Sequence, residues 1–348
     1  MFGTYKPEDV TILLKDITGL VEPLPASVRE KQIQSGRHYC EMLPLEYEPT
    51  EKYLQAYFDA LNRYAKITAA AVKKVSEKIF ADKYRKIALV SLARAGTPIG
   101  ILIKHCLQKN FPCEVAHYTI SIIRGVGIDE NAVKFILSRH NPTEIQFVDG
   151  WTGKGAIQRE LSTAMKNFPE IDAGLAVLSD PAGVASKCGT HEDFLIASSC
   201  LNSTVSGLLS RTFLRRDIIG ENDFHGAAFY RELADKDLTY QFIDAIEKHF
   251  DDAPELKNSV VANSGLVEVK KIAADFKIDD INLIKPGIGE ATRVLLRRVP
   301  WKILVHALDD EAHLGHLYQL AREKSVPLEI YPLKNYRACG LIQKLGDA

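Results

Sequence analysis

The segment FVDGWTGKG, residues 147–155, carries residue types suited to holding a phosphate group. An apolar run leads into Asp149, and a glycine-rich turn with one hydroxyl and one lysine follows. Consecutive backbone N–H groups beside the start of a helix favour a bound anion. The predicted contacts, on a turn that we expect to face solvent, are Gly150, Trp151, Thr152, Gly153, Lys154 and Gly155. A plain tight turn is the alternative interpretation of the glycine spacing.

A second loop, LARAGTP at residues 92–98, also stands between an apolar run and a helix start. Its predicted anion contacts are Arg94, Ala95, Gly96 and Thr97, because a guanidinium and a helix N-terminus both favour a negative group. Arg94 could equally be a surface ion-pair partner. The loop at 150–155 has the spacing neither of a P-loop nor of a dinucleotide-binding motif. Together the two loops favour a sugar ligand with two phosphate centres.

Strands that alternate with helices must position these loops. Predicted strands are the runs 86–93, 114–123, 144–150 and 174–180, and predicted helices begin near residues 50, 97, 130 and 155, the last reaching 168. This alternation predicts an α/β fold with a parallel sheet flanked by helices. Ligands of such sheets bind beyond the carboxyl ends of the strands. Arg94, Arg124, Asp149 and Asp180 all follow predicted strand ends.

Length and composition set the remaining limits. A chain of 348 residues favours two domains, and a net charge of −1 excludes a uniformly basic nucleic-acid-binding protein. The acidic, proline-containing stretch 251–254 is the best linker candidate, which predicts domains at 1–252 and 258–348. We found no apolar run near the roughly 18 residues of a membrane span and no signal peptide. Scattered cysteines without a CxxC pair argue against a zinc ribbon or disulfide framework and favour the cytoplasm.

The two loops resemble those of type I phosphoribosyltransferases. The resemblance implies that the loop at 149–155 holds the 5-phosphate of phosphoribosyl pyrophosphate, with Asp149 on the ribose hydroxyls. It also implies that Arg94, Ala95 and Gly96 hold the pyrophosphate together with Mg²⁺. The chain departs from the usual pattern of two adjacent acids and a Thr-Thr-Gly turn, because Gly150 replaces one acid and the loop is shorter.

Longer stretches resemble the StiP family, whose members are found with bacterial tellurite-resistance and stress genes. They are SGRHYCEMLPLE (35–46), HYTISIIRGVGID (117–129), FVDGWTGKG and SSCLNSTVSGLLSRT (198–212). The resemblance implies that Arg124 reaches the leaving pyrophosphate from a mobile loop, that Asp180 lines the acceptor side, and that residues 36–39 form a hood. A solvated loop and a simple turn are the alternatives for Arg124 and Asp180.

Residues 286–342 resemble the L7Ae/Pelota-like RNA-binding fold: a glycine turn, a helix, a strand, an acidic turn, a helix, a strand and a final small-residue helix. The resemblance implies RNA-backbone contacts at Gly287, Gly289, Glu290, Thr292, Arg293, Lys334 and Arg337. A dimerisation or scaffold domain is the alternative, and a homo-oligomer stays open.

The favoured function is therefore phosphoribosyl transfer to a nucleobase-like or other nitrogen acceptor, or the reverse, phosphorolysis-type step that releases such a base. Its expected partners are phosphoribosyl pyrophosphate or a nucleotide, Mg²⁺ without dedicated protein ligands, and RNA. Two alternatives remain. One is a non-catalytic, nucleotide-sensing RNA-binding protein. The other follows the family's cysteine protease label, with Cys200 as nucleophile near His191 and Asp193, although buried structural cysteines are common.

Overall fold

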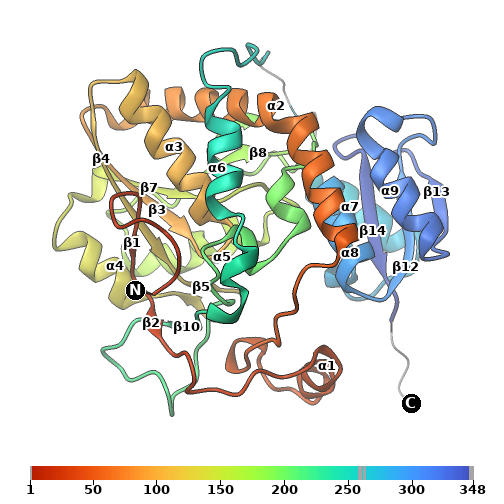
Figure 1. The fold of residues 1–348 in the computed structure, drawn as a ribbon, viewed down its shortest axis with the longest axis horizontal. Helices are drawn as coiled ribbons and strands as arrows, with labels where there is room; N and C mark the ends of the chain where they lie inside the picture. Colours follow the sequence, from red (N-terminus) through yellow and green to blue (C-terminus); the bar gives the residue numbers. More distant parts are fainter. Residues whose placement is uncertain (1, 258–260, 262–263, 345–348) are drawn as a thin grey trace.

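A six-stranded parallel sheet is the centre of the first unit (Figure 1) in the computed structural model, which describes residues 2–257, 261 and 264–344. In sheet order the strands are β1 (Thr11–Ile12), β4 (Glu114–Ile120), β3 (Lys86–Leu92), β7 (Ile145–Val148), β8 (Leu175–Ser179) and β9 (Lys187–Thr190). The predicted parallel α/β sheet is confirmed. The short edge strands β1 and β9 were not predicted.

Helices cover both faces of this sheet. One face packs against α2 (Glu51–Lys83), α3 (Gly96–Asn110) and α6 (Thr239–Glu247), and the other against α4 (Glu130–Leu137) and α5 (Ala156–Ala164). Along β3, Ile87 and Leu89 join the first apolar cluster, whereas Ala88 and Val90 join the second. Burial of both faces explains why these strands read as continuous apolar runs.

Smaller elements surround the ends of the strands. They are α1 (Ala26–Gln34), the pair β2 (Lys15–Asp16) and β10 (Gly226–Ala227), and the hairpin β5 (Ile122–Ile123) and β6 (Gly127–Ile128), with 3-10 turns at 39–41, 142–144, 165–167, 197–200, 203–205, 231–236 and 281–283. The strand predicted at 114–123 is thus broken after Ile120. The helix predicted at 155–168 ends as an α-helix at Ala164.

The C-terminal unit has its own four-stranded sheet. Its elements are α7 (Gly265–Asp275), β11 (Ile284–Pro286), α8 (Ile288–Arg297), β12 (Pro300–Val305), α9 (Glu311–Glu323), β13 (Leu328–Ile330) and β14 (Ala338–Ile342), with strand order β11-β14-β12-β13. The final small-residue helix expected near 338–342 is wrong, because this segment is the buried strand β14. A short apolar run is equally compatible with a strand and a buried helix.

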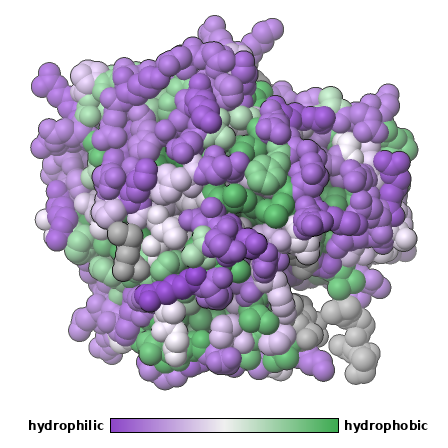
Figure 2. Space-filling view, in the orientation of Figure 1, coloured by the Kyte–Doolittle hydropathy of each residue, from purple (hydrophilic) through white to green (hydrophobic). Residues whose placement is uncertain are grey.

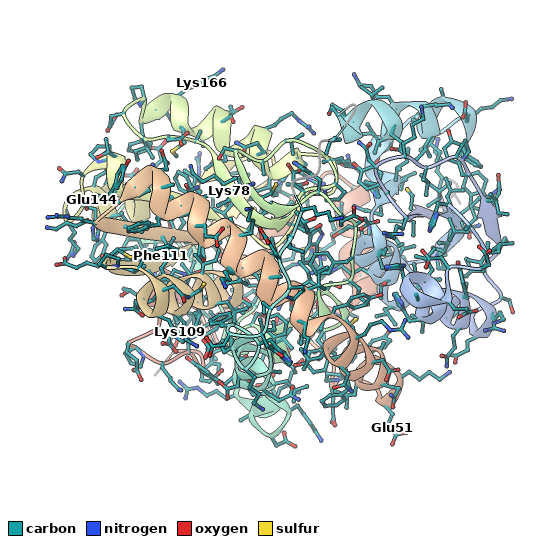
Figure 3. The ribbon with its side chains drawn as sticks, turned by 90° about the horizontal axis from the view of Figure 1, so that it is seen from above. Glu51, Lys78, Lys109, Phe111, Glu144 and Lys166 are labelled. Carbon is teal, nitrogen blue, oxygen red and sulfur yellow. The ribbon has the colours of Figure 1, made fainter. Side chains whose placement is uncertain are left out.

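The long helix α2 joins the two units. Figure 3 shows its Glu51 end near the C-terminal unit and Lys78 over the first unit. Tyr64 donates a hydrogen bond to the Ala312 carbonyl at 3.2 Å, and Tyr57 of α2 shares one apolar cluster with Ile288 and Leu317. The apolar core is therefore continuous across the predicted linker, and the domain boundaries stay a prediction.

The visible face of the molecule in Figure 2 is mainly hydrophilic, with smaller hydrophobic patches. None of the helices in the described part of the chain combines the length and apolar composition needed to cross a membrane.

Candidate functional site

The two predicted anion loops lie against each other. A Cβ atom added to Gly96 would stand 2.7 Å from the Val148 carbonyl oxygen and 3.2 Å from the Cα of Asp149. Only glycine fits such an approach, because any side chain would meet backbone atoms. The start of α3 and the carboxylate after β7 therefore occupy the same edge of the sheet, as the strand-end rule predicts.

Asp149 is the acid at this edge. Its Oδ1 atom accepts the Gly150 backbone N–H at 2.8 Å, and its side chain is half-buried. Desolvation raises the pKa of Asp149 to about 6, with smaller opposing effects from the Gly150 N–H and the charge of Arg293, and a small raising effect of Glu290. The carboxyl group therefore takes up its proton only slightly below neutral pH.

The loop after Asp149 does not face solvent, so that expectation is wrong. Thr152 is 5% exposed and Lys154 8% exposed. Lys154 donates hydrogen bonds to the carbonyls of Ile281 and Ile284 in the C-terminal unit. Burial, with help from Lys285 and Arg124, lowers the pKa of Lys154 to about 8.

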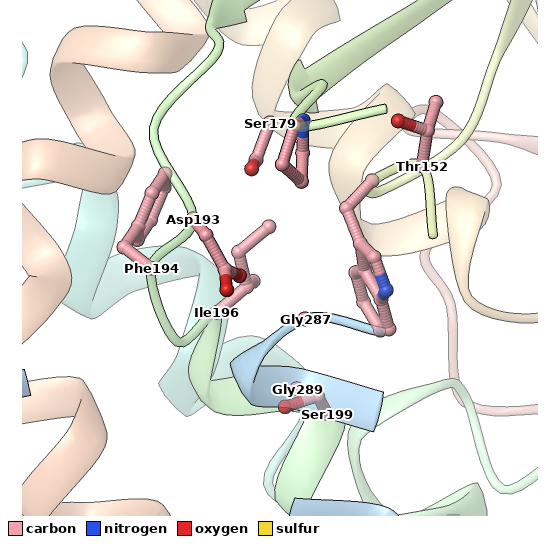
Figure 4. Close-up of a pocket in the computed structure, with 10 residues that line it drawn as sticks. Thr152, Ser179, Asp193, Phe194, Ile196, Ser199, Gly287 and Gly289 are labelled. Atoms are coloured by element: carbon pink, nitrogen blue, oxygen red, sulfur yellow. The ribbon is translucent and has the colours of Figure 1, made fainter. Parts of the chain in front are cut away.

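The C-terminal unit covers the rest of the same loop. The Tyr336 hydroxyl donates to the Gly153 carbonyl, and the guanidinium of Arg293 lies 4.6 Å from the centre of the Trp151 ring. Figure 4 shows the space that remains between Thr152, Asp193 and the start of α8. This cavity measures about 10 Å³, which is about the room that one water molecule needs. A phosphate on Gly153, Lys154 and Gly155 would require these contacts to part.

The predicted cationic residues are held by neighbouring loops. Arg94 donates to the Leu209 carbonyl at 2.8 Å and to Asn202 at 3.2 Å, and lies 3.8 Å from Glu46. Arg124 is exposed on the β5–β6 hairpin, where its side chain donates to Asn282 at 3.3 Å.

Other predicted site residues have internal roles. The Thr97 hydroxyl is buried against the Thr119 hydroxyl at 2.7 Å, so its side chain points into the sheet. The fully buried carboxylate of Asp180 accepts the Thr152 hydroxyl and the N–H groups of Val184 and Ala185. Asp180 thereby joins the loop after β7, which carries Thr152, to the turn after β8, which carries Val184 and Ala185. Gly155 has a φ of 72° and caps α5.

The start of α8 is occupied by an acid of the first unit. Asp193 accepts the backbone N–H groups of Ile288, at 3.0 and 3.1 Å, and of Arg337 at 2.9 Å. Burial raises the pKa of Asp193 to about 6, although these N–H groups oppose the shift. Sequence analysis missed this role, because 95 residues separate Asp193 from Ile288.

Most predicted RNA contacts face the boundary between the units or the C-terminal core. Gly287 and Gly289 line the small cavity. Arg293 pairs with Glu290 at 3.0 Å and donates to the Ser199 carbonyl at 3.2 Å, and Arg337 pairs with Glu192 at 3.1 Å and Asp310 at 3.4 Å. Thr292 is buried against His316. Lys334 is exposed. Their contact with RNA stays a prediction.

The thiol beside His191 belongs to Cys188. Its Sγ atom lies 3.6 Å from Nε2 and 3.9 Å from Nδ1, and the Asp180 carbonyl lies 2.7 Å from Nδ1. Because the two sulfur distances are nearly equal, the sulfur lies beside the ring and not in line with either nitrogen lone pair. A CxxH spacing at the end of β9 was the sequence signal for this pair. Cys200 is fully buried.

Within the described residues, Asp180, Cys188 and His191 also form a group whose ligand atoms lie within 4.8 Å of one another. Burial raises the pKa of Cys188, and the charge of Asp180 adds to that shift against a lowering effect of Lys78. This thiol is therefore not activated as a thiolate.

Comparison with known proteins decides the family. Residues 3–247 match the model of the tellurite-like stress resistance cysteine protease StiP, and residues 263–344 match that of the PELOTA RNA binding domain. A curated relative, cysteine protease StiP of Acinetobacter baylyi, is 38% identical over 99% of this chain and 94% of its own. The chain belongs to the StiP family. The description of this family is that of a stress-resistance enzyme.

Solved structures similar to this StiP-family chain cover about a third of it. The hypoxanthine phosphoribosyltransferase of Trypanosoma cruzi is 16% identical over 35% of this chain and 70% of its own, with a TM-score of 0.27. A Neisseria gonorrhoeae protein with bound ppGpp is 14% identical over 35% and 70% of the two chains, with a TM-score of 0.25. The family assignment comes from the sequence relatives.

Proposed function

We propose that the first unit is a phosphoribosyltransferase-like enzyme. It binds phosphoribosyl pyrophosphate with Mg²⁺ and modifies or releases a nucleobase-like acceptor, within the stress response named in the family description. The observation that supports this proposal is the contact between Gly96 and Asp149. It joins a helix N-terminus, which favours a phosphate group, to a carboxylate, which accepts hydrogen bonds from sugar hydroxyls.

The proposed reaction demands positioning and charge neutralisation. The bond between the sugar C1 atom and the pyrophosphate oxygen breaks, and its electron pair leaves with pyrophosphate. The acceptor nitrogen supplies the electron pair of the new bond, and an N–H acceptor then loses its proton to solvent. The protein must hold both ends and stabilise the developing charges. Asp149 would hold the ribose hydroxyls, while the start of α3, Arg94 and Arg124 would face the leaving group.

The residues present fit a magnesium ion bound through its substrate. Mg²⁺ is usually held by one or two carboxylates together with substrate phosphates. Asp149 supplies one carboxylate, of which Oδ1 is engaged by the Gly150 N–H. Bound magnesium supplies positive charge to the phosphate oxygens. A nearby cation would also lower the raised pKa of Asp149 and favour its charged form.

Pyrophosphate release tests the proposal. The full chain is incubated with phosphoribosyl pyrophosphate, Mg²⁺ and a set of nucleobases, and pyrophosphate is measured. We expect Asp149→Asn to reduce release by on the order of 10²–10³. Asp172→Asn is the matched control, because Asp172 also accepts a neighbouring N–H, that of Gly174, but before β8. Equal release by both variants would refute the assigned role of Asp149.

RNA is the proposed partner of the C-terminal unit, supported by the match of residues 263–344. A nucleotide-sensing RNA-binding protein without catalysis is the corresponding alternative. A thermal-shift series separates the two functions, since a ligand that binds only the folded state raises its melting temperature. An enzyme should respond to phosphoribosyl pyrophosphate with Mg²⁺, and an RNA adaptor to RNA.

A second candidate function is thiol-dependent peptide cleavage. The family description and the contact of Cys188 with His191 favour it. The lateral position of the sulfur and the raised pKa of Cys188 argue against it, because thiolates are the reactive nucleophiles.

A further inference from the structure

Residues 281–284 of the C-terminal unit bind two cations of the first unit that the sequence predicts to hold phosphate groups. The ammonium group of Lys154 donates to the carbonyl oxygens of Ile281 and Ile284, the second at 3.3 Å. The Arg124 guanidinium donates to Oδ1 of Asn282, also at 3.3 Å. Carbonyl and amide oxygens of the C-terminal unit therefore accept hydrogen bonds that the oxygens of a phosphate ligand would otherwise accept.

The first unit makes the reciprocal contact on the C-terminal unit. Asp193 accepts the N–H groups of Ile288, at 3.0 and 3.1 Å, and of Arg337 at 2.9 Å. The neighbouring carboxylate of Glu192 pairs with the Arg337 guanidinium at 3.1 Å. A helix start, a further backbone N–H and a guanidinium are the kinds of donor that bind nucleic-acid phosphates. Two adjacent acids of the first unit occupy these donors.

Little space remains between the units at the phosphate loop. A Cβ atom added to Gly153 would stand 3.6 Å from the Pro286 carbonyl oxygen, and the Tyr336 hydroxyl donates to the Gly153 carbonyl. The cavity beside Thr152 measures about 10 Å³ (Figure 4), which is about the room that one water molecule needs. A phosphate group on this loop therefore requires the C-terminal unit to move away.

A larger cavity of about 350 Å³ adjoins the two acids. Its lining includes Glu192, Asp193, Lys334 and Arg337. This volume is within the range of ligand-binding cavities. A polyanion in this cavity can therefore reach Lys334 and Arg337 while the units are in contact, and compete there with the acids. The match of residues 263–344 to an RNA-binding domain favours RNA as this polyanion.

We propose that the boundary is an autoinhibitory contact in which each unit occupies the anion-binding groups of the other, and that RNA bound by the C-terminal unit opens the phosphate loop of the first unit. Two ligands that each bind only the open state favour one another by the same factor. RNA and phosphoribosyl pyrophosphate therefore bind with positive cooperativity. This inference rests on the proposed function and extends it, because it couples the two ligands.

Calorimetry of the full chain with phosphoribosyl pyrophosphate and Mg²⁺, with and without an oligouridylate RNA, tests the coupling. We expect the RNA to tighten this binding severalfold in wild type. Asp193→Ala should raise the affinity without RNA by about tenfold, the effect typical of a charge-assisted hydrogen bond, and should diminish the effect of RNA. Tyr336→Phe weakens the boundary without a change of charge and should act in the same direction. Asp172→Ala, which loses a surface-turn hydrogen bond to Gly174, is the matched control.

Trp151 reports the opening directly. Its ring centre lies 4.6 Å from the Arg293 guanidinium across the boundary. The chain has one other tryptophan, Trp301, so a Trp301→Phe background isolates the signal. We expect the RNA to increase acrylamide quenching of Trp151 fluorescence, because parted units expose the ring. Thermal denaturation confirms that each variant is folded.

The outcomes separate this inference from the proposed function. A chain that binds no RNA, or RNA binding that changes neither the quenching nor the affinity for phosphoribosyl pyrophosphate, overturns the inference alone. Folded Asp193→Ala and Tyr336→Phe proteins that bind this ligand like wild type overturn it as well, even if pyrophosphate release depends on Asp149. Cooperative binding of both ligands without any turnover would support the inference and contradict the enzyme. Absence of phosphoribosyl pyrophosphate binding in every variant overturns both.

Discussion

Asp193 places both carboxylate oxygens on the backbone N–H of Ile288, at 3.0 and 3.1 Å, across the boundary between the two units. The N-terminus of a helix is a natural anion site. In this StiP-family chain, the protein's own acid occupies that site at α8. An RNA phosphate at the same N–H group would have to compete with Asp193, so RNA binding there and closure of the units exclude each other.

Removing this acid should loosen the boundary. Asp193→Ala leaves the N–H groups of Ile288 and Arg337 without their carboxylate, which we expect to cost about 1–3 kcal/mol of unfolding free energy. Denaturant titration of the full chain measures the loss. Asp172→Ala, which breaks only a surface-turn hydrogen bond to Gly174, should cost clearly less. Equal losses of unfolding free energy in the two variants would mean that the contact of Asp193 across the boundary contributes no more than a surface-turn hydrogen bond.

Protonation of the same acid should stabilise the fold. The pKa of Asp193 rises from 3.8 to about 6 on folding, so between these values the folded state binds more protons than the unfolded state. The contribution of Asp193 to the unfolding free energy therefore increases as pH falls from 7 to 5, by about 1 kcal/mol. Asp193→Asn should lack this increment when the two proteins are compared at both pH values. Parallel pH profiles of wild type and variant would contradict the assignment.

The contacts of the C-terminal unit that cover residues 150–155 can be weakened without changing that loop. Tyr336→Phe deletes only the hydroxyl that donates to the Gly153 carbonyl. If 5-phosphate binding requires the cover to part, affinity for phosphoribosyl pyrophosphate should rise severalfold. Lys154→Ala should weaken binding and also reduce stability, because Lys154 bonds two carbonyls of the C-terminal unit. Calorimetry checks both. Weaker binding by Tyr336→Phe would show that the closed contact assists the ligand.

Thiol labelling distinguishes the two enzyme classes. Half-buried Cys113 should react with iodoacetamide before the buried thiols of Cys188 and Cys200. Cys200→Ser should cost about 1 kcal/mol through an extra buried hydroxyl and leave pyrophosphate release intact. Mass spectrometry reads the order of modification. Fast, pH-dependent alkylation of Cys188 or Cys200 together with peptide cleavage would support a protease.

Truncation tests how far the units depend on each other. A chain ending at Asp252 exposes the face of α2 around Tyr57 that packs in the shared apolar cluster. We expect it to melt at a lower temperature than the full chain and to bind more hydrophobic dye. An unchanged melting temperature would show that the first unit is independent and that the predicted boundary separates two folding units.

The elements that could be predicted from the sequence are those that local residue patterns determine. Strands β3, β7 and β8 were predicted because apolar runs follow from burial on both faces. Strand β4 was predicted from a β-rich segment that alternates imperfectly. The proximity of Gly96 and Asp149 followed from the parallel sheet. Docking of the two units was beyond such reasoning, because contacts such as Lys154 with Ile284 join residues 130 positions apart. The strand β14 was mistaken for a helix because the five-residue run ACGLI is too short to carry a decisive period.

Helix α2 extends over 33 residues without a glycine or proline, so it is a rod about 50 Å long. Sharp bends in helices usually arise at those residue types. Its C-terminal half is fixed beside the parallel sheet, where Lys78 donates to the Cys188 carbonyl, and its N-terminal half contacts the C-terminal unit, where Tyr64 donates to the Ala312 carbonyl. Helix α2 therefore contains neither of the residue types at which helices usually bend. Because α2 is not expected to bend, any parting of the units over the phosphate loop would have to break its contacts with the C-terminal unit, such as the hydrogen bond from Tyr64 to the Ala312 carbonyl.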